Sequence, residues 1–299
     1  MIKTADRGFG VWQLAGRFDL SGLAGKRVAL KANYNSADPF PASTHLDTLA
    51  ALINVLRDRG AAGIAVAERS GMGYTPDVLE AMGVTDLARK MGFRLQALDL
   101  LEDPADWMPQ NGEGFGWKQG YQFSRIFSDA DAIVQTCCLK THRFGGHFTM
   151  SLKNSVGMVA RYDPQTGYDY MRELHTSPNQ RRMIAEINTS YRPALVVMDA
   201  LQGFTAGGPE AGKLVAPGLL LASADRVALD ACGVALLRSY GTTPEISRGD
   251  AFGQEQIARA GQLGLGAKNR DEVEIVPLND DARDACRAME KELTGRQLA

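Results

Sequence analysis

The residues best suited to acid–base and ligand chemistry gather in one segment of this 299-residue chain. Only 4 histidines occur, and three of them lie between residues 142 and 175. Two lysines share the segment, in the runs LKTH (139–142) and SLKN (151–154). The residues concerned are Lys140, His142, His147, Lys153 and His175. A neutral imidazole offers a lone pair and titrates near neutral pH, and a lysine ammonium binds carboxylate or phosphate. The segment therefore predicts a site.

The types of these residues leave several roles open. A lysine binds an anion when charged and acts as a base when burial lowers its pKa. His142 or His175 could move a proton, or the histidines could hold a metal ion together with a carboxylate. The candidates for such a metal ion are His142, His147, His175 and Asp199. The spacing of the first two histidines differs from the helical HExxH motif of zinc enzymes, and two glycines stand between them. The metal, and any other cofactor, therefore stays unknown.

Charge and hydropathy exclude several classes of protein. The formal net charge of -2 and the sequence pI of about 6.1 give no basic field for nucleic acid or an anionic membrane. No apolar run approaches the roughly 20 residues of a membrane helix. Residues 1–9 lack the apolar centre of a signal peptide. We therefore expect a cytoplasmic protein with neither nucleic acid nor a membrane as partner.

The four cysteines carry no metal-binding spacing. Cys137 and Cys138 are adjacent, and Cys232 and Cys286 are distant singles. Without a CxxC run, neither a zinc ribbon nor a ferredoxin-type iron–sulfur motif is present in the chain. We expect buried, reduced thiols. The alternative is a thiolate at Cys137 or Cys138, if Lys140 lowers its pKa.

Short β-rich runs alternate with longer helical runs along the chain. This pattern predicts an α/β fold with a mainly parallel sheet flanked by helices. The expected strands are 27–33, 64–68, 94–100, 132–139, 194–201, 218–224 and 272–278. The expected helices are 44–59, 76–82, 84–91, 150–158, 183–191, 227–240, 254–263 and, as an exposed helix, 280–298. We expect one domain over 1–299; the alternative is two lobes, about 1–130 and 131–299, with the site between them.

Long irregular insertions interrupt the pattern at 102–119 and 140–178. The first insertion, rich in glycine and tryptophan, suggests a mobile or lid-like segment. Three polar residues outside the insertions have local interpretations. His45 begins a helix, Asp225 suits a helix N-cap, and Asp230 lies in an apolar helix where it needs an inward hydrogen-bond partner.

Polar residues stand where the expected strands stop. They are Lys31 and Asn33, Glu68, Lys140 and His142, and Asp199. The carboxyl ends of parallel strands open on one edge of the sheet, where ligands bind in α/β proteins. We therefore expect one shared cleft at that edge.

Five stretches of sequence, in chain order, carry a family resemblance. They are 28–33 (VALKAN) with Thr44-His45, 139–142 (LKTH), 151–157 (SLKNSVG), 198–203 (MDALQG) leading to 207–209 (GGP), and 222–225 (ASAD) with Asp230-Ala231. Together they resemble the domain-of-unknown-function 362 family over about residues 26–240. The family's usual KPN run has Ala32 in place of its proline here. Many members carry a ferredoxin-like module with two iron–sulfur clusters, which this chain lacks. The resemblance thus identifies positions rather than a reaction.

Two hypotheses of different classes follow. In the first, the protein is an enzyme that binds a small anionic substrate, carboxylate or phosphate, and His142 or His175 moves a proton. The substrate-binding candidates are Lys31, Lys140 and Lys153 for charge, Asn33 and Asn154 for orientation, and the backbone amides of Gly207 and Gly208. In the second, an accessory protein binds a metal or iron–sulfur cluster together with a ferredoxin-like partner. A ligand sensor without turnover is a third, weaker alternative.

Overall fold

One large sheet organises the structure, a computed structural model that describes residues 1–293. This part of the chain contains a nine-stranded sheet in the order β1-β11-β9-β7-β2-β3-β4, with β10 paired to β9 and β8 to β7. The strands are β1 (Ile2–Lys3), β2 (Arg27–Lys31), β3 (Gly63–Glu68), β4 (Arg94–Ala97), β7 (Ala132–His142), β8 (His147–Phe148), β9 (Leu195–Gly207), β10 (Gly212–Val215) and β11 (Leu219–Ser223). A separate hairpin consists of β5 (Trp107–Gln110) and β6 (Tyr121–Ser124).

The centre of the sheet is parallel, as predicted. Strands β9, β7, β2, β3 and β4 run in one direction, and β11 runs in the opposite direction, so that it pairs antiparallel with both β9 and β1. Central parallel strands are buried on both faces, which explains why nearly every residue of β2 and β7 is buried and why both strands are rich in apolar residues. The α/β prediction is therefore confirmed.

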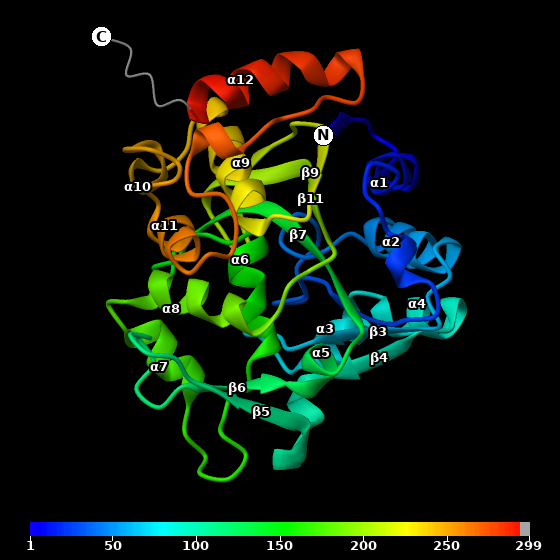
Figure 1. Ribbon diagram of the computed structural model, residues 1–299, viewed down its shortest axis with the longest axis vertical. Coiled ribbons are helices and arrows are strands. Elements are labelled where there is room, and N and C mark those ends of the chain that lie inside the picture. The colour runs from blue at the N-terminus through cyan, green and yellow to red at the C-terminus, as the bar shows by residue number, and fades with distance from the viewer. Residues whose placement is uncertain (294–299) are drawn as a thin grey trace.

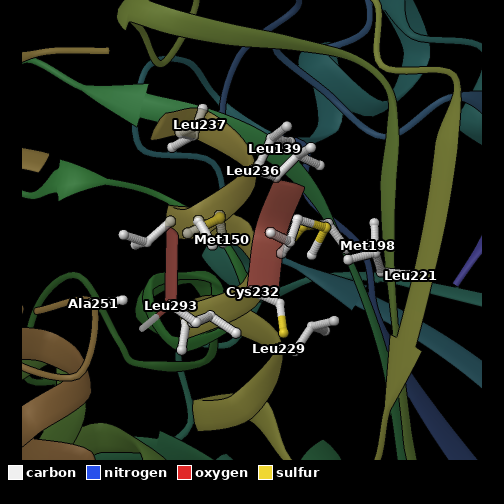
Figure 2. Packing of buried hydrophobic residues seen from close by; sticks show 14 of the residues in the cluster. Leu139, Met150, Met198, Leu221, Leu229, Cys232, Leu236, Leu237, Ala251 and Leu293 are labelled. Carbon is white, nitrogen blue, oxygen red and sulfur yellow. The ribbon is translucent and has the colours of Figure 1, made fainter. Parts of the chain in front are cut away.

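Helices cover both faces of the sheet (Figure 1). On one face lie α1 (Arg7–Ala15), α2 (Leu46–Asp58), α3 (Thr75–Ala81) and α4 (Val84–Met91), which pack on alternate residues of β2 and β7 such as Leu30 and Val134. On the other face lie α6 (Ser151–Asn154), α7 (Tyr170–Thr176), α8 (Gln180–Ile187), α9 (Arg226–Ser239), α11 (Glu255–Gln262) and α12 (Arg283–Leu293). The short helices α5 (Arg125–Ser128) and α10 (Pro244–Ser247) complete the set. Figure 2 shows α9 packed by Leu229, Cys232 and Leu236 beside strand residues Leu139 and Met198.

Three polar residues hold the starts of helices in place, as the sequence predicts. Asp225 caps α9, because its carboxylate accepts hydrogen bonds from the backbone of Val227 and Ala228. Asp230 is buried in α9 and accepts from the backbone of Ser151 and Leu152, at 2.8 and 2.9 Å. Asp230 thereby holds the start of α6 against α9. His45 caps α2, with its Nδ1 accepting from the backbone of Asp47 at 3.1 Å.

The C-terminal elements differ from the prediction. Residues 272–278 form no strand; the N-terminus of Met1 donates to Val276, and Leu278 donates back to Met1. The expected exposed helix is shorter at its start and is not exposed all round, since Cys286, Met289 and Leu293 of α12 are buried. Residues 294–298 of that prediction lie outside the described residues. The amphipathic helix α1 had not been predicted.

The glycine-rich insertion at 102–119 packs into the structure. Trp107 and Trp117 are buried, and their indole nitrogens donate to the carbonyls of Leu101 and Met183. None of residues 102–119 lines the large cavity at the carboxyl edge of the sheet, so the segment is not a lid over it in this structure, and its mobility stays a prediction. The second insertion, 140–178, does line it. The sheet itself takes strands from both halves of the chain, and the division into one domain or two lobes stays a prediction.

Candidate functional site

A cavity of about 590 Å³ opens at the carboxyl ends of β2, β3 and β7. Both histidines predicted for proton transfer line it, as do five of the seven predicted substrate-binding residues: Lys31, Asn33, Lys140, His142, Lys153, Asn154 and His175. Glu68, which ends β3, lines it too. The strand-end argument therefore places these residues together, and the second insertion supplies the opposite wall.

All three ammonium hydrogens of Lys31 bond to protein groups at the floor of the cavity. Its ammonium donates to Glu68 Oε1 at 2.5 Å, to the carbonyl of Ala32 at 2.7 Å and to Asn154 Oδ1 at 2.9 Å. Since an ammonium has three hydrogens, none is left for a ligand. These contacts do not support the predicted role of Lys31 in binding an anion; its role in this structure is to join β2, β3 and α6.

Asn154 is equally committed to the protein. Its Oδ1 accepts from Lys31, and its Nδ2 donates to the carbonyl of Thr136 at 2.9 Å. Gly157 closes over the same group, because a Cβ there would lie 2.9 Å from Lys31 Nζ and 2.8 Å from Glu68 Oε1. The predicted role of Asn154 in orienting a substrate is not supported by these contacts.

Lys140 uses two of its three ammonium hydrogens in bonds to the protein. Its ammonium donates to Asn33 Oδ1 at 2.7 Å and to the carbonyl of Ala42, which leaves one hydrogen. Burial lowers its pKa from the ordinary lysine value. The amide nitrogen of Asn33 hydrogen-bonds to none of the described residues. Lys140 and Asn33 therefore keep donors on the cavity side.

Lys153 differs from the other two lysines. Its side chain is only 9% exposed, and within residues 1–293 its ammonium makes no hydrogen bond and no ion pair. Burial, with the nearby charges of Lys140 and Arg69, lowers its pKa to about 8. A buried ammonium without a partner costs several kcal/mol. Lys153 is therefore a buried cation of the cavity without a partner among residues 1–293.

His175 lines the cavity with one ring nitrogen, Nε2, that has no hydrogen-bond partner among the described residues. It is exposed on α7, and its Nδ1 lies 2.7 Å from the carbonyl oxygen of Met171. A carbonyl oxygen only accepts, so in the neutral ring Nδ1 carries the hydrogen and Nε2 keeps its lone pair. Burial of part of the ring and the charge of Lys153 lower the pKa of His175, and keep that lone pair available. The arrangement suits a general base.

His142 lies deeper, beside Lys153. It is 7% exposed, and its Nδ1 is buried without a hydrogen-bond partner among the described residues. Burial and the charge of Lys153 lower the pKa of His142 far below its ordinary value, so the ring is neutral. A Cβ on Gly146 would lie 2.9 Å from His142 Nδ1 and 3.1 Å from Lys153 Cε. The two side chains therefore both lie against Gly146 and leave no room for a larger residue there.

Cationic groups outnumber acidic ones along the cavity wall. Beside the lysines stand Arg69, Arg161 and Arg172, which sequence reasoning missed. Arg69 is buried and donates to the carbonyls of Val156 and Val159, both at 2.7 Å, whereas the other two arginines are exposed. The position of Arg69, directly after Glu68 at a strand end, was the one signal that could have identified it. The cavity is thus a site of positive potential.

Comparison with known proteins agrees with the sequence motifs. Residues 28–235, more than half of the chain, match the model of the family described as "Domain of unknown function (DUF362)". The chain belongs to the DUF362 family. No curated protein matches it. Among solved structures, the lactate racemase apoprotein from Thermoanaerobacterium thermosaccharolyticum matches with a TM-score of 0.48 and 12% identity, over 98% of this chain and 90% of that chain. Similarity of this degree carries no information on the reaction of the DUF362 protein.

Two predicted metal ligands of the DUF362 chain lie away from the cavity. Asp199 is buried within β9, where it accepts from Arg7 Nε at 2.8 Å and from Thr48 Oγ1 at 2.6 Å. His147 pairs with His142 across β7 and β8, and both line a neighbouring depression of about 380 Å³, but His147 does not line the cavity. No group of three or more His, Cys, Asp or Glu residues that could hold a metal ion occurs within residues 1–293. The proposed set of His142, His147, His175 and Asp199 is therefore not brought together.

The glycine loop and the cysteines also serve the fold. Gly207 (φ 82°) and Gly208 (φ 64°) turn the chain between β9 and β10, and neither lines the cavity. A Cβ on Gly208 would lie 2.1 Å from the carbonyl oxygen of Thr141, so the loop packs on the backbone of β7. Cys137 and Cys138 are buried, and burial raises the pKa of Cys138 to about 12. The thiolate alternative is wrong, and substrate binding by the two glycines is not supported.

No helix within residues 1–293 is long and apolar enough to span a membrane.

Proposed function

We propose that this DUF362 protein is an enzyme that binds a small anionic substrate, a carboxylate or a phosphate, in the cationic cavity and moves a proton on it. The observation that carries the proposal is Lys153, a residue that is nine-tenths buried, lines the cavity, and has no partner for its ammonium in residues 1–293. An anion in the cavity would offset the cost of burying that charge. The volume of about 590 Å³ lies within the range of small-molecule sites.

The remaining donors suit the same ligand. Lys140 retains one ammonium hydrogen, and the amide of Asn33 is free to donate. These groups and Lys153 could share the oxygens of one carboxylate or phosphate. Lys31 and Asn154 fix the floor beneath them through Glu68 and Thr136.

The two histidines support proton transfer. His175 offers the lone pair of Nε2, the arrangement that a general base needs. His142 is neutral and lines the cavity, so its ring could hydrogen-bond a group of the substrate. A bound anion would also neutralise the charge of Lys153, which is one of the causes of the low pKa of both histidines. Substrate binding would thereby make both rings better bases.

Calorimetric titration with inorganic phosphate and with acetate tests the proposal. We expect at least one of these anions to bind, Lys153→Met to weaken its binding by about tenfold or more, and Lys153→Arg to keep most of it, because the charge remains. Lys90→Met is the matched control, since Lys90 is exposed on α4 outside the cavity. Binding of equal strength in wild type and in Lys153→Met would contradict the proposal.

His175→Gln tests the second half of the proposal once a substrate is found. We expect it to bind the anion as wild type does and to exchange the substrate's proton with solvent deuterium far more slowly. Normal exchange in this variant would exclude His175 as the base.

A further inference from the structure

The three lysines of the cavity differ in how many hydrogen bonds their ammonium groups donate to the protein. Lys31 donates to three acceptors and Lys140 to two. Lys153 donates to none in the part of the chain that the structure describes. An amine acts as a nucleophile only if it can lose a proton and direct its lone pair at a substrate. Lys31 would have to break the ion pair with Glu68 to do so, whereas Lys153 would break nothing.

We propose that Lys153 is a covalent catalyst, whose side-chain amine forms an imine with an anionic substrate that also carries a carbonyl group, such as an oxo acid. This inference rests on the proposed function, because the same cavity binds the anionic part of the substrate. It adds the class of substrate and the bond that forms.

The surroundings of Lys153 favour its neutral form. The side chain is enclosed, and Lys140 and Arg69 place positive charge nearby. Desolvation and a neighbouring cation are the two devices that make a lysine nucleophilic at neutral pH. The resulting pKa of about 8 leaves roughly a tenth of the amine unprotonated at pH 7.

The neighbours of Lys153 suit the steps of imine formation. His175 Nε2 is available to take the proton that the ammonium must lose, and the charge of Lys153 is one of the causes of the low pKa of that ring. Gly146 lies against both His142 and the end of the Lys153 side chain, because a Cβ there would be 2.9 Å from His142 Nδ1 and 3.1 Å from Lys153 Cε. Lys140 and Asn33 remain to hold the carboxylate or phosphate of the same substrate.

The reaction balances without any further reagent. The lone pair of Lys153 Nζ forms a bond to the carbonyl carbon, and the carbonyl π electrons move to oxygen, which takes a proton. The carbinolamine loses this oxygen as water, so that amine and carbonyl give imine and water. The protonated imine withdraws electrons from the adjacent carbon, and a hydrogen there becomes acidic enough for a histidine base.

Reductive trapping tests the proposal. The protein is incubated with pyruvate, 2-oxoglutarate or acetoacetate, reduced with borohydride and measured by intact mass and peptide mapping. We expect at least one oxo acid to add its own mass less one oxygen atom, at Lys153 alone. Borohydride without oxo acid, and acetate in place of oxo acid, are the blanks.

Two variants separate covalent catalysis from simple anion binding. Lys153→Arg keeps the charge, so we expect it to bind the oxo acid and to lose trapping. Lys153→Cys should also lose trapping, and alkylation of the new thiol with 2-bromoethylamine should restore it by rebuilding an amine of nearly the same length. The four native cysteines are buried, and wild type treated in the same way controls for their alkylation.

The outcomes distinguish this inference from the proposed function. Calorimetric binding of phosphate, acetate or an oxo acid without any adduct at Lys153 would overturn the imine and leave the anion site standing. Adducts at other lysines only would overturn it as well. Absence of binding by all of these anions would overturn both proposals.

Discussion

Lys31 and Glu68 form a buried ion pair, 2.5 Å between Nζ and Oε1, that joins the last residues of the neighbouring strands β2 and β3. Both side chains are nearly inaccessible, with 1% and 2% exposure. Glu68 also accepts from the backbone of Tyr34 and Arg69, both at 3.0 Å. The pair therefore anchors the loops that follow both strands, and the cavity floor depends on it.

Removing one partner of this pair should destabilise the fold. Lys31→Met leaves Glu68 buried without its cation, so we expect the free energy of unfolding to fall by about 3–5 kcal/mol. Urea unfolding followed by circular dichroism measures the change. The double variant Lys31→Met/Glu68→Gln should recover part of the loss, because no net charge remains buried. A loss below about 1 kcal/mol in the single variant would mean that the pair is not an anchor.

Anion binding should weaken as the pH rises through about 8. The pKa of Lys153 is lowered to about 8, so its charge is complete below this pH and lost above it. Calorimetric titration of phosphate between pH 8 and 10 should show the fall in affinity, after correction for the buffer's heat of ionisation. In Lys153→Arg the fall in this window should disappear, because a guanidinium stays charged. The same pH dependence in both proteins would assign the titration to another group.

The cost of burying Lys153 should be visible in the stability of the unliganded protein. A lysine whose folded pKa lies near 8 rather than at 10.5 lowers the free energy of unfolding at pH 7 by an amount on the order of 3 kcal/mol. Lys153→Met should therefore stabilise the protein at pH 7. The folded state binds fewer protons than the unfolded state between pH 8 and 10.5, so the gain should shrink across this window and vanish above it. Thermal unfolding of both proteins at several pH values measures this.

The sequence predicts a strand well when the pattern within the strand itself reveals it, and poorly when the strand would depend on a distant, short pairing. The central strands follow from their apolar runs, since burial on both faces leaves that pattern. Residues 272–278 have a strand-like composition, yet their partner is Met1, and the pairing is only two hydrogen bonds long. No local pattern predicts so distant and short a pairing.

The strand-end argument worked for some site residues and failed for one. It succeeded for Glu68 and Lys140, because β3 and β7 end at or just beyond them. It failed for Asp199, because β9 continues to Gly207 with an irregularity in its pairing to β7 between Cys138 and Leu139. Nor could sequence separate Lys31 from Lys153, since the acceptors that occupy Lys31 include the carbonyl of Ala32 and side chains far away in the chain.

Gly146→Ala should damage the site while leaving the fold intact. The new Cβ would meet His142 Nδ1 at 2.9 Å and Lys153 Cε at 3.1 Å, so one of the two side chains must move. Both lie in the cavity that the proposed substrate occupies, so we expect phosphate affinity to drop severalfold with a change in melting temperature of a few degrees at most. Gly22→Ala is the control, because nothing lies within 4 Å of a Cβ at Gly22. Calorimetric titration and thermal unfolding of both variants make the comparison. Wild-type affinity in Gly146→Ala would show that the spacing of His142 and Lys153 does not matter for binding.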